Sequence, residues 1–463
     1  MIVVLVALLS GAMFYWSQGL DNVWALAWFA PAPLLWLAYG KTPLWQLLVA
    51  SAVAALAGSI YVFQAYAMLP PLVIVPAVVL NAASFCFAVW FARCVQRHAS
   101  PLATLFAFPA CWTAIEFLAE LASPNGTYGS LAYSTMSAPV LIQCASLFGM
   151  YAVTFLICLF ANTLAMSMRA QGQTLFTVGV GFGLCAANVV FGFVRLAQPQ
   201  PDAVRVAALV DETAMARLGH ARTLPEAVAV SETYAMALRR AAAQGAEFAV
   251  TPEGGLLSVP PWRTAILAPL LAASKPTGME VIGGFYQRKP PADFALAIGP
   301  DGAMQRYDKR HPVPVLEDQF TPGRVSGWLG HGRAMEICKD MDFPRTIRAD
   351  AAKGARLMGV PAGDFGQDAW LHARMAVMRG VENGFALVRA ANEGLVTASD
   401  AEGRLIASKR DTPTGLTMIV ARLPLGRGPT LYTRTGNGFA WLCVAGTLVI
   451  GAISLRGRRQ RPF

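Results

Sequence analysis

The first 196 residues carry only eight charged side chains, and this scarcity constrains the fold more than any other feature of the sequence. Long apolar stretches run through Met1–Leu196, whereas Ala197–Gly436 has an ordinary share of charged residues. Over all 463 residues, 55% are hydrophobic and 14% are charged. A water-soluble protein of this length would be less apolar. The sequence therefore predicts one part that folds in lipid and another that folds in water.

Apolar segments of about 20 residues can cross a membrane as helices. We expect eight of them, near residues 2–18, 23–39, 44–66, 71–92, 101–119, 139–168, 175–194 and 439–455. The first should be retained, because no cleavage site of small residues followed by a soluble chain is present. The predicted domains are thus a seven-helix membrane domain at 1–196, an outer domain at 197–436, and a final helix with a basic tail at 437–463.

Eight basic residues flank these segments on one side: Lys41, Arg93, Arg97, Arg169, Arg456, Arg458, Arg459 and Arg461. Lys and Arg near the ends of membrane helices mark the cytoplasmic side. Both termini should then be inside, and the loop with Asp21, the loop at 120–138 and the whole of 197–436 outside. We expect a multi-pass protein of a bacterial inner membrane, with its outer domain in the periplasm.

The net charge of +10 does not indicate nucleic acid. Many of the basic residues serve as membrane anchors, and 197–436 contains no dense basic run with interleaved aromatic residues. The histidines, cysteines and acids show no spacing typical of metal ligands. We therefore expect neither a nucleic-acid partner nor a metal or other cofactor.

Cys338 is the single cysteine of the outer domain. The other seven lie in or beside the apolar segments, so Cys338 has no partner for a disulfide within its domain. A lone cysteine can be a buried, inert thiol, since free cysteine is among the most buried residue types. It can also be a reactive thiolate.

Three residues with chemical potential follow predicted strands of the outer domain. Glu253 comes after the strand Phe248–Thr251, Lys309 after the strand that ends "QRYD", and Cys338 after "RAMEI". Sites in α/β folds form at the carboxyl ends of strands. A thiolate can attack a carbonyl, a carboxylate can take the thiol proton, and a lysine can orient the base and stabilise an oxyanion. Each residue alone is more often structural, but together they suggest one site.

The motifs "TPEGG", "YDKRHPVP" and "EICKDMDFP", in this order, resemble the Glu-Lys-Cys signature of the nitrilase, or carbon–nitrogen hydrolase, superfamily. The stretch Val360–Gly394 resembles the segment that supports that site. With its apolar segments, nearly the whole chain is similar to the apolipoprotein N-acyltransferase family. The resemblance implies an α-helical membrane domain joined to an α-β-β-α sandwich.

By this resemblance Glu253 is the general base, Lys309 the residue that orients it and stabilises the oxyanion, and Cys338 the nucleophile. Glu317 and Asp340 match supporting acids of the family. Phe320, Trp328 and Leu329 precede Cys338 and are candidates for a lipid-facing lip, although core packing explains them equally well.

The implied reaction is acyl transfer from a membrane phospholipid, through a thioester on Cys338, to an amine. In the family that amine is the N-terminus of a diacylglyceryl-cysteine lipoprotein. We expect a monomer. Three alternatives remain: a membrane-tethered amidase or nitrilase-like hydrolase, an N-acyltransferase for another amine, and an inactive scaffold or transporter.

Overall fold

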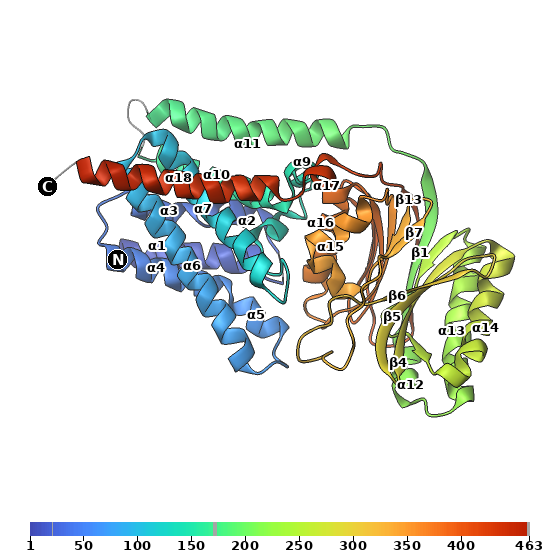
Figure 1. The fold of residues 1–463 in the computed structure, drawn as a ribbon. Coiled ribbons are helices and arrows are strands. Elements are labelled where there is room, and N and C mark those ends of the chain that lie inside the picture. Colours follow the sequence, from blue (N-terminus) through green and yellow to red (C-terminus); the bar gives the residue numbers. More distant parts are fainter. Residues whose placement is uncertain (21, 170–173, 461–463) are drawn as a thin grey trace. The chain divides into compact units, whose positions relative to one another are not determined.

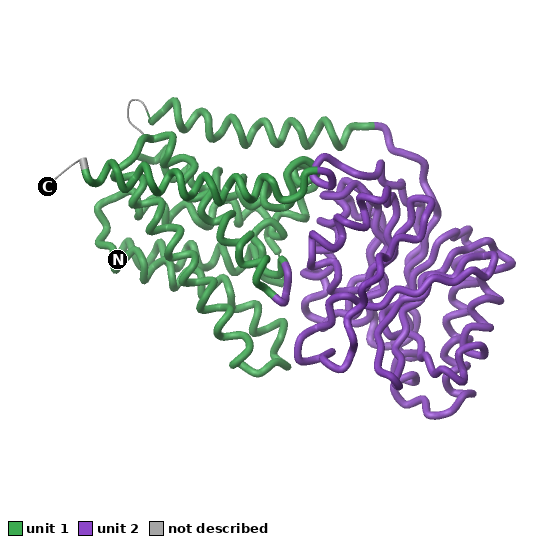
Figure 2. The backbone as a smooth tube through the Cα atoms, in the orientation of Figure 1, with its two compact units in different colours: residues 1–123, 127–198, 435–463 green, residues 124–126, 199–434 purple. Residues whose placement is uncertain are grey.

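The computed structural model describes residues 1–20, 22–169 and 174–460. The chain forms two compact units (Figure 2). Unit 1 consists of Met1–Ser123, Thr127–Gln198 and Thr435–Phe463, and unit 2 of Pro124–Gly126 and Pro199–Arg434. Asp21 and Arg461, two of the charges used above to predict orientation, lie outside the described residues.

Unit 1 is built from helices (Figure 1). They are α1 (Ile2–Gln18), α2 (Trp24–Phe29), α3 (Ala32–Ala38), α4 (Leu44–Gly58), α5 (Ile60–Ala65), α6 (Pro71–His98), α7 (Pro101–Ala122), η1 (Leu131–Thr135), α8 (Pro139–Ile142), α9 (Ala145–Phe148), α10 (Met150–Ser167), α11 (Thr174–Leu196) and α18 (Gly438–Gln460). All eight predicted apolar segments are therefore helical.

Six helices in the described ranges are long and apolar enough to cross a membrane. They are Leu44–Ala65, Pro71–His98, Pro101–Ala122, Met150–Ser167, Thr174–Leu196 and Gly438–Arg459. The predicted segments at 2–18 and 23–39 form the shorter helices Ile2–Gln18 and Trp24–Ala38. The number of full-length spans is thus six by this criterion, where the sequence predicted about eight.

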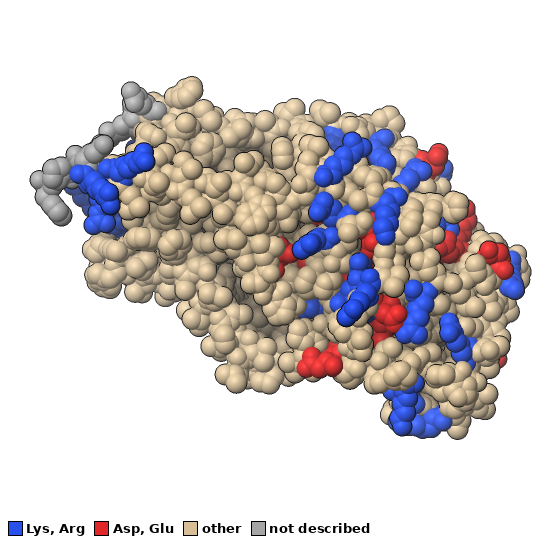
Figure 3. Space-filling model, viewed as in Figure 1, with Lys and Arg blue, Asp and Glu red and all other residues tan. Residues whose placement is uncertain are grey.

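The helix ends that carry basic residues meet at one end of unit 1. Arg93 Nη2 donates to the Thr42 carbonyl at 2.6 Å, and Arg169 Nε donates to the Trp36 carbonyl at 3.1 Å. Near the end of α18, the Ser454 hydroxyl donates to a carbonyl near the end of α6, at 3.2 Å. Figure 3 shows a group of basic side chains at this end of α18, beside a surface almost free of charge. The basic residues therefore cluster in space as well as in sequence.

Unit 2 contains two sheets. The first has the order β13-β1-β2-β4-β5-β6, with β3 also paired to β4, and the second has the order β12-β11-β10-β9-β8-β7. The strands are β1 (Ala203–Asp211), β2 (Phe248–Val250), β3 (Leu256–Ser258), β4 (Glu280–Arg288), β5 (Pro291–Ile298), β6 (Met304–Asp308), β7 (Trp328–Gly330), β8 (Arg333–Met335), β9 (Leu357–Gly363), β10 (Ala386–Asn392), β11 (Leu395–Ser399), β12 (Leu405–Arg410) and β13 (Leu416–Pro424).

Helices cover the outer faces of both sheets. Helices α12 (Glu212–His220), α13 (Leu224–Ala243) and α14 (Arg263–Ser274) pack on the first sheet, and α15 (Pro344–Ala351) and α16 (Ala369–Asn383) lie on the side of the second (Figure 1). The alternation of side chains along β1 produces this layering. Val206 and Ala208 belong to the core between the sheets, whereas Ala207 and Leu209 belong to the core beneath the helices. The predicted α-β-β-α sandwich is confirmed.

The strand directions bring the predicted site together. Strands β2 and β4 are parallel, and two antiparallel pairings from β4 through β5 to β6 return the chain to the same direction. The carboxyl ends of β2 and β6 therefore lie at one edge of the first sheet. At this edge the Glu253 amide donates to the carbonyl of Ala362 in β9, at 3.3 Å, and so connects the two sheets.

Candidate active site

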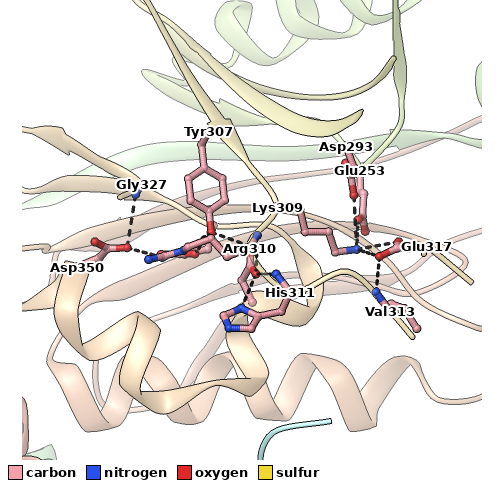
Figure 4. A network of polar contacts seen from close by, with 12 residues as sticks. Glu253, Asp293, Tyr307, Lys309, Arg310, His311, Val313, Glu317, Gly327 and Asp350 are labelled. Carbon is pink, nitrogen blue, oxygen red and sulfur yellow. Dashed lines mark hydrogen bonds and ion pairs between the residues drawn. The ribbon is translucent and has the colours of Figure 1, made fainter. Parts of the chain in front are cut away.

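Lys309 lies at the centre of a cluster of buried carboxyl groups. Its Nζ is 2.5 Å from Glu253 Oε1, 2.7 Å from Glu317 Oε2 and 3.5 Å from Asp293 Oδ2 (Figure 4). The Lys309 side chain is 1% exposed, and the amide of Val313 donates to Glu317 Oε2 at 2.6 Å. Carboxylate oxygens of the three acids lie within 4.8 Å of one another. The lysine ammonium therefore supplies the positive charge that allows these acids to be buried together.

The environments of the three acids differ enough to separate their pKa values. Burial raises the pKa of Asp293 far above its usual range, and the neighbouring charge of Glu253 raises it further. Burial and Glu253 also raise the pKa of Glu317. For Glu253, burial is outweighed by the Lys309 ammonium and by hydrogen bonds that include one from Cys338, so its pKa is lowered. Glu253 is thus the most readily ionised member of the cluster, and its hydrogen bond with Cys338 places it to take the thiol proton.

Cys338 is half-buried and begins the short helix η4 (Cys338–Asp342). Its backbone has φ +41°, a value that non-glycine residues rarely adopt, and its Sγ donates to the Gly363 carbonyl at 3.2 Å. Strained backbone of this kind is concentrated at functional sites. Burial and the charge of Glu253 raise the pKa of the thiol well above its usual value, against the influence of Lys309 and Arg389. The resting residue is therefore a thiol that needs a base before it can attack.

Asp340 supports the loop that carries Lys309. Its Oδ1 accepts hydrogen bonds from the amides of Arg310 and His311, at 3.1 and 2.8 Å, and its Oδ2 accepts one from the Tyr307 hydroxyl at 2.7 Å. His311 Nδ1 lies 2.8 Å from Asp340 Oδ1, and its ring stacks on another aromatic ring of the same region. Asp340 is fully buried. It therefore fixes the segment after β6 to the turn that begins with Cys338.

The substitution Asp340→Asn should lower the thermal midpoint of unfolding at pH 7, by an amount equivalent to about 1–3 kcal/mol. Although burial raises the pKa of Asp340, the hydrogen bond from His311 and the charge of that ring lower it overall. The stabilisation is therefore present above the ordinary aspartate pKa and is lost as the pH falls through the lowered value. Melting curves of both proteins in detergent measure this. The difference in unfolding midpoint between the variant and the parent protein should be smaller at pH 3 than at pH 7.

The matched control is Asp308→Asn, in which the carboxylate of a partly exposed ion pair with Arg306 is lost. Such pairs contribute little to stability, so its midpoint should move much less. Equal shifts for the two variants would contradict the supporting role of Asp340.

The three apolar residues predicted to contact lipid lie in two places. The Phe320 ring is half-buried and tilted against the Tyr286 ring, with centroids 5.5 Å apart, and the charges of Glu253 and Lys309 act on Tyr286. Trp328 and Leu329 belong to the edge strand β7, where Leu329 packs against the core between the sheets. Phe320 is therefore near the carboxylate cluster, and the role of all three in lipid contact stays a prediction.

Two features of the site escaped the sequence analysis. Asp293 is 3% exposed in the middle of β5, and the signal that could have revealed it was a single acid within the otherwise apolar strand "DFALAI". Arg389, in the middle of β10, and Asp364, directly after β9, form a buried bidentate ion pair. Both charges act on the Cys338 thiol. These residues surround the site from strands that are distant in sequence, so no short motif points to them.

Comparison with known proteins identifies the family. Residues 195–427 match the family model described as carbon-nitrogen hydrolase. The chain belongs to the carbon–nitrogen hydrolase family. Residues 10–163 of this hydrolase-family chain also match the model described as the apolipoprotein N-acyltransferase N-terminal domain. The part of the chain before the hydrolase-like domain is therefore similar to the N-terminal domain of apolipoprotein N-acyltransferases.

Two relatives that match most of this carbon–nitrogen hydrolase family member are both called apolipoprotein N-acyltransferase. A protein from Geobacter metallireducens called apolipoprotein N-acyltransferase is 28% identical, over 98% of this chain and 95% of the relative. Another of that name, from Gloeobacter violaceus, is 26% identical over 80% of this chain and 76% of the relative. Among solved structures, an amidase from Nesterenkonia sp. is 22% identical with a TM-score of 0.40, over 49% of this chain and 93% of that one. With its apolar helices, the chain is a multi-pass membrane protein.

Proposed function

We propose that this protein is a membrane N-acyltransferase that moves an acyl chain from a phospholipid, through a thioester on Cys338, to an amine. The amine is the N-terminus of a diacylglyceryl-cysteine lipoprotein. The observation that carries the proposal is the contact between Glu253 and Lys309 beside a strained Cys338. The name of two relatives, apolipoprotein N-acyltransferase, supports N-acyl transfer to a lipoprotein.

In the first half of the reaction, Glu253 takes the thiol proton while the sulfur of Cys338 attacks the ester carbonyl of the phospholipid. Lys309 stabilises the oxyanion that forms. The carbon–oxygen bond then breaks, and the lysophospholipid leaves as an alcohol with the proton from Glu253.

In the second half, the acceptor amine attacks the thioester and transfers a proton to Glu253. The carbon–sulfur bond breaks, the amide product forms, and the proton returns to the sulfur. Glu317 and Asp340 hold Lys309 and its loop in place during both halves.

The basic end of unit 1 supports an inner-membrane orientation with that end in the cytoplasm. Residues 197–436 would then be a periplasmic catalytic domain, after a membrane domain at 1–196 and before a final helix with a basic tail at 437–463. Lipoprotein N-termini on the periplasmic leaflet would be accessible to this domain. We also propose that the protein acts as a monomer.

A hydrolase that passes the acyl group to water is the main alternative, because Glu253, Lys309 and Cys338 would serve it equally. An acyltransferase for another amine would also use the same first half-reaction. The nature of the acceptor decides among the three.

Incubation of the purified protein with phospholipid should add the mass of one acyl chain to the intact protein, because the thioester accumulates when no amine is present. Hydroxylamine should remove this mass, and Cys338→Ser should not acquire a hydroxylamine-sensitive adduct. A diacylglyceryl-cysteine peptide added afterwards should become N-acylated. Release of free fatty acid in place of that product would favour the hydrolase, and no adduct with any phospholipid would refute the donor.

A further inference from the structure

Lys339, the residue after the proposed nucleophile, has an unusual position for a lysine. It is 8% exposed, within η4, and its Nζ donates to Asn125 Oδ1 at 2.6 Å. Asn125 precedes it by 214 residues and lies in the loop that follows α7. A long, charged side chain is rarely buried unless its ammonium group has a partner. Asn125 provides one.

The loop that carries Asn125 packs against both ends of η4. Gly126 has φ +53°, and a Cβ atom there would lie 2.3 Å from the Asp342 carbonyl oxygen. Backbone approaches this closely only where the residue is glycine. The short segment Pro124–Gly126 also belongs to unit 2, although the chain on either side of it belongs to unit 1. Asn125 therefore contacts the start of η4 while Gly126 contacts its end.

Cys338 itself needs such support. Its φ of +41° is a strained conformation for a residue with a side chain, and the strain persists only where surrounding contacts hold the backbone in place. The Lys339–Asn125 hydrogen bond and the Gly126–Asp342 packing are contacts of this kind.

We propose that Lys339 and Asn125 form a positioning pair, in which the Pro124–Gly126 loop holds η4 so that Cys338 keeps its reactive conformation with the Lys339 ammonium beside it. This role rests on the proposed function of Cys338 as the nucleophile. It assigns Lys339 no contact with substrate.

The charged groups around Lys339 and Cys338 determine how loss of the pair would change the pKa of Cys338. Glu253, Lys309, Arg389 and Asp364 act on the Cys338 thiol. Asp342, Cys338, Lys309 and Glu317 act on Lys339, and the attraction between the thiolate and the Lys339 ammonium is mutual. A neutral side chain at 339 should therefore raise the pKa of Cys338, while Asn125→Ala leaves the charge in place.

The test is the rate at which iodoacetamide alkylates Cys338 in the full-length protein, followed on the Cys338 peptide by mass spectrometry from pH 6 to pH 10. Asn125→Ala should slow alkylation about ten-fold at pH 8, because it loses a hydrogen bond to a charged group. Lys339→Met should slow alkylation more, because it loses the same hydrogen bond and the positive charge beside the thiol. The double variant should be no slower than the slower single one, since both substitutions break the same contact. Of the two single variants, Lys339→Met alone should shift the midpoint of the alkylation pH profile to higher pH, by about one unit. Lys339→Arg, which keeps the positive charge, should have the parental midpoint.

Lys409→Met, on the exposed strand β12, is the control and should leave both rate and profile unchanged. If Lys339→Met does not fold, Asn125→Ala and Lys339→Arg still decide the question, because Asn125 itself is exposed and its substitution takes away only this partner of the Lys339 ammonium. The proposed pair would be refuted if the slowing in the double variant equalled the product of the slowing in the two single variants. An unchanged alkylation rate in Asn125→Ala would also refute it. Alkylation needs no lipid, so this result stands even if no acyl-enzyme forms from phospholipid, an outcome that would count against the proposed function alone.

Discussion

Glu253→Gln should slow the formation of the acyl-enzyme on Cys338 by about 10²–10⁴-fold, the range that removal of a general base produces. Glutamine has the shape of glutamate, and its carbonyl oxygen can still accept the hydrogen bond that Lys309 donates to Oε1 at 2.5 Å. An amide cannot take the thiol proton. The measurement is the rate of acyl-mass gain in a single turnover, with phospholipid in excess.

Glu317→Gln is the matched control for this substitution. Glu317 also contacts Lys309, at 2.7 Å, but it is Glu253 that shares a hydrogen bond with the Cys338 thiol. Its loss should slow acylation much less than the loss of Glu253. If the two variants behave alike, or if Glu253→Gln acylates at the parental rate, another group is the base.

Lys309→Met should lower the free energy of unfolding by about 3–5 kcal/mol, as expected when one partner of a buried ion pair is removed. The side chain is 1% exposed, and its Nζ lies within 3.5 Å of a carboxylate oxygen on each of Glu253, Asp293 and Glu317. Without the ammonium these acids must bind protons or remain buried and unpaired. Protonation is easier in acid, so the loss of stability should be greater at pH 8 than at pH 5. Thermal unfolding in detergent at the two pH values measures it.

Two further variants isolate the cause of this effect. Lys409→Met replaces an exposed lysine and should change the unfolding midpoint little. Adding Asp293→Asn to Lys309→Met removes one of the unpaired carboxyl groups and should recover part of the lost stability. A double variant less stable than Lys309→Met would show that repulsion among the carboxylates is not what destabilises it.

The sequence predicted those parts of the fold and site that depend on local pattern. Apolar length determined which segments are helical, and the short apolar run Phe248–Thr251 predicted a strand, which is β2. Glu253, Lys309 and Cys338 stood out because each follows a strand, and strand ends can be recognised from neighbouring residues alone. Helix length was harder, since Ile2–Gln18 and Trp24–Ala38 fall short of the spans predicted there.

Contacts between distant residues could not be predicted in the same way. Asp293 reaches Lys309 because β5 and β6 pair with Phe294 opposite Asp308, a register that no short motif encodes. The hydrogen bond from Lys339 to Asn125 joins residues 214 positions apart. Such contacts arise from tertiary packing, so they become visible only once the strands and helices have been assembled.

The pairing of β1 with β13 has a consequence for how this architecture could have arisen. The first and last strands of unit 2 are neighbours, with Ala203 opposite Pro424 and Asp211 opposite Leu416. The chain therefore enters and leaves the sandwich side by side, which is the arrangement that lets one domain be inserted into another without disturbing either. A free-standing α/β enzyme could have been grafted into a helical host as one continuous piece of gene. In that history the loop Pro124–Gly126 is the exception, because this part of unit 2 comes from the host's own sequence.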